Sequence, residues 1–255
     1  MRQRKSKEGV VAVVAMALAG VVLTAVPDRA RAQSIWPERA QNLQVLPEDF
    51  PPQRLRAVMQ GFTRALGVRC SHCHVGEEGE PLSSYDFASD DNPNKDRARA
   101  MYRMLGVINQ ELRGIEPSGP EAVNMWCHTC HNGKPRPQTL DEAVMEAYRL
   151  EGAASALERF GALRARYYGA AAYDFTAGSV NELAEQFLEQ GDTASAEAFF
   201  ERNAEDHPDA YRAWERLGDL ALIRGDTATA AGHYQRALTL APDNARIRRS
   251  LDAIR

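Results

Sequence analysis

The sequence predicts a mainly α-helical protein, in which an N-terminal module with few regular elements precedes an α-helical repeat array. Three observations predict this. Apolar residues recur at helical spacing in two segments of the N-terminal half, the C-terminal half repeats with a period of 34 residues, and all four cysteines stand in two copies of Cys-x-x-Cys-His. The formal net charge of −4 provides no basic field, so we expect no nucleic-acid partner.

Residues 1–32 have the pattern of a secretory signal peptide. A short stretch rich in Lys and Arg precedes the apolar run 10–26, and Ala30-Arg31-Ala32 forms a small-x-small cleavage site. The alternative is an uncleaved N-terminal anchor, because the apolar run is long for a signal peptide. Either interpretation places the protein in the periplasm or on the outer face of the cytoplasmic membrane.

The stretches RCSHCHVG and WCHTCHNG carry the chemistry. Two local disulfides or a four-thiolate zinc site would also use paired cysteines, but neither calls for a histidine after each pair. Covalent c-type haem requires this histidine. The two thiols form thioethers with the haem, and the next residue supplies an axial nitrogen to the iron. We therefore expect two covalently bound haem c groups, anchored and ligated by Cys70, Cys73, His74, Cys127, Cys130 and His131.

The sixth ligand of each iron decides between electron transfer and catalysis. Upstream of the first motif, Pro51 and Pro52 predict a helix start, and Gly67 predicts its end in a left-handed turn. Met59 lies on the apolar face of this helix, about two turns before the reversal, where its sulfur could reach a haem. The alternative is a methionine of the core.

A second apolar stripe precedes the second motif. Met101 belongs to it together with Leu105, Ile108 and Leu112, and Met104 lies one turn from Met101. Spacing does not distinguish Met101 from Met104 as the axial ligand.

The segments NLQVLPEDF, VMQGFTRALGVRCSHCHVG, RARAMYRMLGVIN and WCHTCHNGKPRP resemble one two-haem half of the cytochrome c subunit of photosynthetic reaction centres. The resemblance covers residues 41–138 and implies a dihaem c-type cytochrome module. It implies Met59 and Met101 as axial ligands, because the family's second methionine is the first of a pair shortly before Ile-Asn, here Ile108-Asn109. The chain departs from the family in carrying two motifs instead of four.

The segment 77–95 between the first motif and the second stripe is acidic and polar. We expect a solvated connection there, with the covering of a haem edge or contact with a partner as the alternatives.

The C-terminal half resembles tetratricopeptide repeats. Residues 177–210 and 211–244 form two repeats in which Gly191-Asp192 returns as Gly225-Asp226, and 245–255 forms a capping helix. Two repeats bury little core, so residues 139–176 are expected to add linking or capping helices, starting at a capping box of Thr139 and Glu142. Such arrays present a surface for a protein or peptide.

These observations predict an exported dihaem electron carrier that docks on redox partner proteins through its repeats. A membrane redox complex or a photosynthetic reaction centre is the candidate partner that the resemblance implies. Two other classes remain: a dihaem peroxidase-like enzyme, which needs one iron open to substrate, and a haem-containing assembly or scaffold protein.

Overall fold

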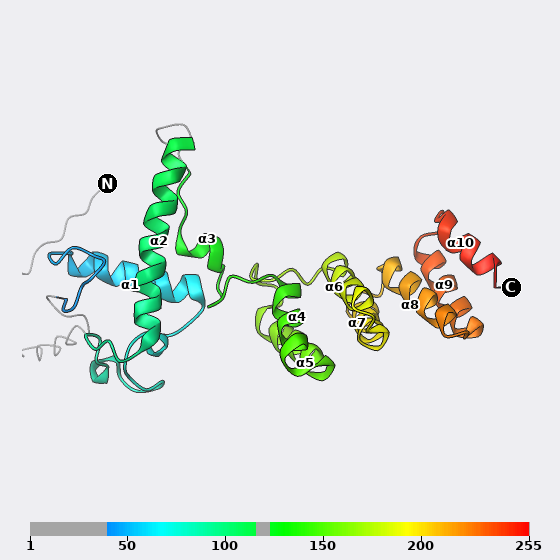
Figure 1. The fold of residues 1–255 in the computed structure, drawn as a ribbon, viewed down its shortest axis with the longest axis horizontal. Coiled ribbons are helices and arrows are strands. Elements are labelled where there is room, and N and C mark those ends of the chain that lie inside the picture. The colour runs from blue at the N-terminus through cyan, green and yellow to red at the C-terminus, as the bar shows by residue number, and fades with distance from the viewer. Residues whose placement is uncertain (1–39, 116–122, 255) are drawn as a thin grey trace, which may run out of the picture.

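The structure is a computed structural model that describes residues 40–115 and 123–254 (Figure 1). These residues form helices and contain no strand, with a single isolated β-bridge between Val75 and Asp86. The predicted mainly α-helical fold is confirmed. The helices of the N-terminal part are α1 (Pro52–Leu66), η1 (Cys70–His72), η2 (Leu82–Ser84), α2 (Pro93–Ile115) and α3 (Cys127–His131).

Helix α1 begins and ends where the sequence predicts. Pro52 stands at the first helical position, where its missing N–H costs no hydrogen bond. Gly67 follows the last residue with φ 64°, in the left-handed region, and its N–H donates to the carbonyl of Thr63. Only Leu55 and Ala65 of this helix are buried, so most of its apolar face, Met59 included, is only half covered.

Helix α2 is the long element of the N-terminal part. Its 23 residues extend over about 35 Å. It crosses α1, and the rings of Phe62 and Tyr102 meet edge to face at the crossing, with centroids 6.3 Å apart (Figure 1). Its length allows one helix to contact the segments around both Cys-x-x-Cys-His motifs.

The C-terminal part is a row of paired helices that leads away from α1 and α2 (Figure 1). Its helices are α4 (Leu140–Glu151), α5 (Ala153–Tyr167), α6 (Ala177–Glu189), α7 (Thr193–Asp206), α8 (Tyr211–Ile223), α9 (Thr227–Leu240) and α10 (Ala245–Asp252). The first of them begins at the predicted capping box: Glu142 N–H donates to Thr139 Oγ1, and Thr139 N–H donates to the Glu142 carboxylate at 2.9 Å.

A continuous apolar core runs through this row. One cluster of buried side chains takes in α4 to α8, and a second takes in α8 to α10. Aromatic rings fill the space within and between the pairs. Phe187 of α6 stacks on Phe199 of α7 at 5.0 Å, and Phe160 of α5 meets Phe199 edge to face at 5.5 Å. Helices α4 and α5 therefore pack onto the repeats as a further layer, which gives two repeats the core that they would lack alone.

The repeated Gly-Asp pair has a structural reason. Gly191 and Gly225 adopt φ 76° and 80° in the turn between the two helices of a repeat, where a side chain would be strained. The aspartate that follows caps the second helix: Asp192 accepts from the N–H of Ser195 at 2.9 Å, and Asp226 from that of Thr229 at 3.0 Å.

Asp192 makes more contacts than its counterpart. It also accepts from Tyr148 Oη at 2.9 Å and Ser195 Oγ at 2.7 Å. We expect Asp192→Ala to lower the free energy of unfolding by about 1–2 kcal/mol in urea unfolding followed by circular dichroism. Asp226→Ala is the matched control and should cost less, because Asp226 has no contact equivalent to Tyr148. Equal losses would contradict this expectation.

The Asp192 cap also predicts a pH dependence. The hydrogen bonds from Ser195, first from its N–H, lower the pKa of Asp192 in the folded protein. The stabilisation is therefore complete above the ordinary carboxyl pKa of about 3.9 and is lost as the pH falls below it. Asp192→Asn retains an acceptor that does not titrate, so its stability should fall less than that of the natural protein between pH 5 and pH 3.

None of the helices in residues 40–115 and 123–254 has the length and hydropathy that crossing a membrane requires. The predicted signal peptide, residues 1–32, lies outside the described residues.

Candidate functional site

The first Cys-x-x-Cys-His motif forms a tight turn between α1 and α2. Its first three residues are the short helix η1, and His74 N–H donates to the carbonyl of Cys70 at 3.0 Å. The start of α2 is hydrogen-bonded to this turn, because the Asn94 side chain donates to the carbonyl of His72 at 2.9 Å. The thiols of Cys70 and Cys73 are thereby carried on one compact piece of backbone.

His74 is half-buried, and its ring lies edge to face against Phe87, with centroids 5.0 Å apart. Its Nδ1 atom is buried without a hydrogen-bond partner. Burial, and next the positive charge of Lys95, lower the pKa of His74, against an opposing contribution from the Phe87 carbonyl. The ring is therefore neutral near pH 7, which is the form that binds metals.

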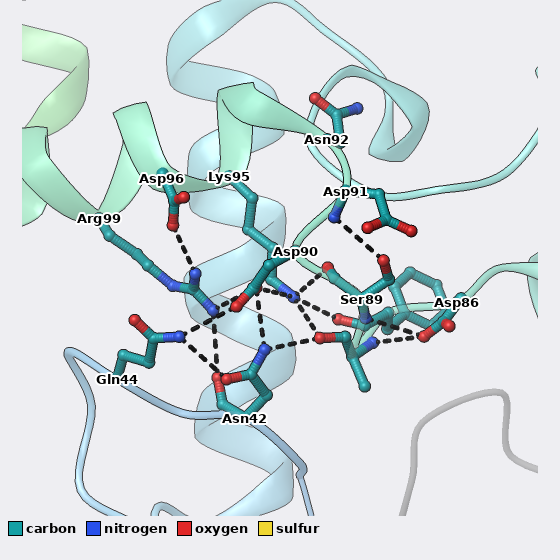
Figure 2. A network of polar contacts seen from close by, with 12 residues as sticks. Asn42, Gln44, Asp86, Ser89, Asp90, Asp91, Asn92, Lys95, Asp96 and Arg99 are labelled. Carbon is teal, nitrogen blue, oxygen red and sulfur yellow. Dashed lines mark hydrogen bonds and ion pairs between the residues drawn. The ribbon is translucent and has the colours of Figure 1, made fainter.

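A polar cluster beside this histidine is centred on Asp90 (Figure 2). Its carboxylate lies 2.8 Å from Arg99 Nη2 and 3.1 Å from Lys95 Nζ, and it accepts from the side chains of Asn42 and Gln44 at 2.8 and 3.1 Å. The guanidinium of Arg99, followed by the Asn42 amide, holds the pKa of Asp90 well below its usual range. Arg99 also pairs with Asp96 at 2.6 Å.

The loop before α2 is thus more than the solvated connection that we expected. Lys95 Nζ donates to the carbonyls of Phe87, Ala88 and Ser89 at 3.0, 2.9 and 2.6 Å, so the loop wraps around one ammonium group. Because Phe87 belongs to this wrapped segment, the cluster also holds its ring against His74. The acidic composition of residues 77–95 does not show this, because the contacts depend on one lysine at the end of the segment, Lys95, and on Arg99 beyond it.

The second motif is the short helix α3, and α2 also holds the segment that leads into it. The Asn109 side chain donates to the carbonyl of Met125 at 2.9 Å and accepts from its N–H at 2.7 Å. Asn109, the asparagine of the Ile-Asn pair on which the resemblance rests, therefore attaches α2 to the backbone two residues before Cys127.

His131 is buried, with 8% of its surface exposed, and its Nδ1 lies 3.0 Å from the carbonyl oxygen of Lys134. A carbonyl oxygen only accepts, so Nδ1 donates this hydrogen bond, and Nε2 is the ring nitrogen that remains for a metal. The backbone bond also sets the orientation of the ring.

The end of α1, the second motif and the repeat array meet at one junction. Gly133 N–H donates to the carbonyl of Ala65 at 2.8 Å, and Arg166 of α5 donates to the carbonyl of Gly67 at 3.1 Å. Asn132 donates through its side chain to the carbonyl of Ala171 in the loop between α5 and α6. The segment after the first helix and the segment after the second motif therefore share one support.

This junction leaves no room for a side chain at position 67. A Cβ on Gly67 would lie 2.0 Å from the backbone oxygen of Gly133, and the residue has a positive φ. We expect Gly67→Ala to lower the free energy of unfolding by at least about 2 kcal/mol. Gly61→Ala is the control in the same helix, where a Cβ meets nothing within 4 Å, and it should stabilise α1 by about 0.5–1 kcal/mol. Similar urea midpoints for the two variants would refute the expectation.

The described residues of the N-terminal part bury few apolar side chains and expose several large ones. Both apolar core clusters consist of residues of the repeat array, and among the described residues before Thr139 the buried apolar side chains are those of Leu55 and Ala65. Large apolar side chains on α2 and near the second motif are exposed instead, namely Met101, Met104, Val107, Ile115, Val123 and Trp126. A module of this size needs an apolar core, and haem groups attached to the cysteines would provide one.

The donor atoms of the two motifs indicate which cofactor they could hold. All four cysteines are free thiols, and burial raises the pKa of Cys73 and of Cys127. In residues 40–115 and 123–254 no group of three or more histidine, cysteine or acidic side chains could hold a metal ion. The donor set of each motif, two thiols and one histidine nitrogen, fits a covalently attached haem.

The three candidate methionines differ in exposure. Met59 on α1 is half-buried, whereas Met101 and Met104 on α2 are 40% and 47% exposed. Their roles as ligands stay predictions.

Comparison with known proteins identifies the family. The family model of the photosynthetic reaction centre cytochrome C subunit matches residues 14–194. The chain belongs to the reaction-centre cytochrome family. The match is wider than the 41–138 that the motifs indicated, and it includes α4 to α6. A tetratricopeptide-repeat model matches residues 181–245, which confirms the repeats.

A relative of known name supports the same assignment. Cytochrome c-554 of Chloroflexus aurantiacus is 34% identical over 94 residues, which are 37% of this chain and 20% of the relative, so the chain spans about a fifth of that protein's length. The chain therefore belongs to a family of c-type cytochromes, and the family implies covalently bound haem c.

Proposed function

We propose that this reaction-centre cytochrome is an exported dihaem electron carrier whose repeat array docks a redox partner. The observation that carries the proposal is the doubled Cys-x-x-Cys-His motif in a part of the chain whose described residues form almost no apolar core. The repeat array, by contrast, has a complete core of its own. Two haems therefore supply what the N-terminal module lacks.

The first haem would be anchored by Cys70 and Cys73 and ligated by His74 and Met59. The turn at Gly67 is consistent with this set, because it ends α1 and leads the chain into the first motif, while Met59 lies half-buried on the same helix. Lys95 and Asp90 contribute by holding the loop that packs Phe87 on His74.

The second haem would be anchored by Cys127 and Cys130 and ligated by His131. Its sixth ligand would be Met101, as the resemblance implies, with Met104 as the alternative. Both side chains are exposed on α2, so a haem could cover them. Asn109 brings the motif to this helix through the backbone of Met125.

When bound, each haem would carry one electron through the ferric and ferrous states of its iron. The chain's own residues would orient the histidine rings, and a methionine ligand would exclude water and small ligands from the metal. Helix α2 contacts both motif segments through Asn94 and Asn109, so it holds the two sites in one rigid piece.

The repeat array offers a surface for the partner. A polar groove with side chains of both charge signs lies between α6, α8 and the start of α10, lined among others by Asn181, Glu182, Glu185, Arg212 and Arg216. A charged groove suits a soluble domain or a polar loop of a partner protein. We propose a membrane redox complex, such as a photosynthetic reaction centre, as that partner, and the predicted leader would place the carrier on the periplasmic side.

Mass spectrometry and a pyridine haemochrome assay on the exported protein test the proposal. Two covalent haems per chain are expected, and the ferric spectrum should contain a sulfur-to-iron charge-transfer band for both. Reduced protein should bind carbon monoxide poorly. A spectrum that changes on addition of peroxide would favour the peroxidase-like alternative, and one haem or none per chain would overturn the proposal.

A further inference from the structure

Lys134 is a buried cation next to the proposed ligand of the second haem. It follows His131 by three residues, its carbonyl accepts from that ring, and 8% of its surface is exposed. Its ammonium group donates to the carbonyls of Gln138 at 2.5 Å and Ala172 at 2.6 Å, and it lies 4.1 Å from the centroid of the Tyr173 ring. Carbonyl dipoles and an aromatic face thus hold the charge.

Among the described residues, no carboxylate contacts this ammonium group directly. None of the ion pairs within the described part of the chain includes Lys134. The acid that acts on it through space is Glu142, whose carboxylate accepts from the N–H of Thr139 in the capping box. Burial lowers the pKa of Lys134, and the charge of Glu142 opposes this. The second site therefore places a lysine ammonium beside its histidine, held by carbonyls and an aromatic ring.

The first site is arranged differently. Its two buried cations, Lys95 and Arg99, share the carboxylate of Asp90, and Arg99 pairs in addition with Asp96. Carboxylates therefore contact both cations directly, which is not the case for Lys134. The pKa of His74 is lowered first by burial and then by the charges of Lys95 and Arg99, so the first site also has a positive field.

We propose that Lys134 is a positioning residue that raises the reduction potential of the second haem. The proposal rests on the proposed function. A fixed positive charge disfavours the ferric state, which carries one more positive charge than the ferrous state, and the effect is strong where water is excluded. Because the carbonyl of the same residue orients the His131 ring, the charge stays at a nearly constant distance from the metal.

The repeat array takes part in this arrangement. Ala172 and Tyr173 belong to the loop between α5 and α6, and the neighbouring Ala171 accepts from Asn132. The groups that hold the ammonium therefore come from the same part of the chain that is proposed to dock a partner. It follows that the array sets a property of the second haem and is more than a docking surface.

Redox titration of the full-length holoprotein, followed by absorbance, tests the proposal. In Lys134→Gln, whose amide still donates to the carbonyls, one of the two reduction steps should move to lower potential. We expect about a tenfold change in the ratio of reduced to oxidised haem, which is about 59 mV for one electron. Lys134→Arg retains the charge and should restore most of the potential.

Two control variants sharpen the test. Arg136→Gln removes the same charge from the same segment, but this side chain is 63% exposed and paired with Glu146, so both steps should stay in place. Lys95→Gln removes a cation from the first site, so it should lower the potential of the reduction step that Lys134→Gln leaves unchanged. Lys134→Met serves as a second neutral variant if the Gln variant fails to mature.

The outcomes are distinguishable. If two haems are present and the neutral Lys134 variants shift neither step more than Arg136→Gln does, the inference is wrong. The same holds if the Lys134 and Lys95 variants move the same step. A protein with fewer than two haems would remove the proposed function itself, and the inference with it.

Discussion

Replacing Cys127 and Cys130 together with serine should leave about one covalent haem per chain and should unfold the segment around α3, while the repeat array stays folded. The physical reason is the distribution of the core. The apolar clusters of the described residues lie in the array, whereas α2 and the segment just before α3 expose large apolar side chains that a haem would cover. Loss of that haem removes more apolar contact area than any single side chain provides.

Intact mass and limited proteolysis would measure this effect. We expect the double variant to lose one haem mass and to be cleaved readily in residues 93–138, with a protected fragment that begins near Leu140. His128→Gln is the control, since this exposed residue stands at a variable position of the same motif and its loss should cost no haem. A double variant that resists protease like the natural protein would show that the haem does not complete the core.

The second large effect concerns the sixth ligand of the second iron. In Met101→Leu, one of the two haems should lose its sulfur-to-iron band and bind carbon monoxide when reduced. Its reduction potential should fall by an amount on the order of 0.1 V, because axial ligands shift haem potentials over about 0.8 V in total. Leucine retains the apolar volume, so stability should change little.

Met104→Leu is a closely matched control. Met104 lies one turn along α2 from Met101, and the two side chains are exposed to a similar degree, at 40% and 47%. If Met101 is the ligand, the Met104 variant should keep both sulfur bands. The reverse result would assign the role to Met104, and an unchanged spectrum in both variants would mean that α2 supplies no ligand.

Local patterns predicted much of the fold. The 34-residue period predicted the repeats, and each repeated Gly-Asp pair occupies a left-handed turn followed by a helix cap. The start and end of α1 and the capping box of α4 also follow from their sequences. These features depend on residues within about one turn of each other, which is why a sequence alone reveals them.

The surroundings of the candidate sites were not predictable in this way. Lys134 donates to a carbonyl 38 residues further on, and Arg99 to one 57 residues earlier. Composition described the loop before α2 as acidic, yet one lysine organises it. Nothing in the local pattern of Lys134 distinguishes it from a surface lysine.

The sequence by itself determined the expected cofactor and the helical class. Both the haem-attachment motif and the helical spacing of apolar residues depend on residues only a few positions apart. The tertiary structure alone decided the charge around each histidine. That charge depends on burial and on carbonyls and carboxylates that come together only when distant segments fold, and such contacts have no signature in spacing or composition.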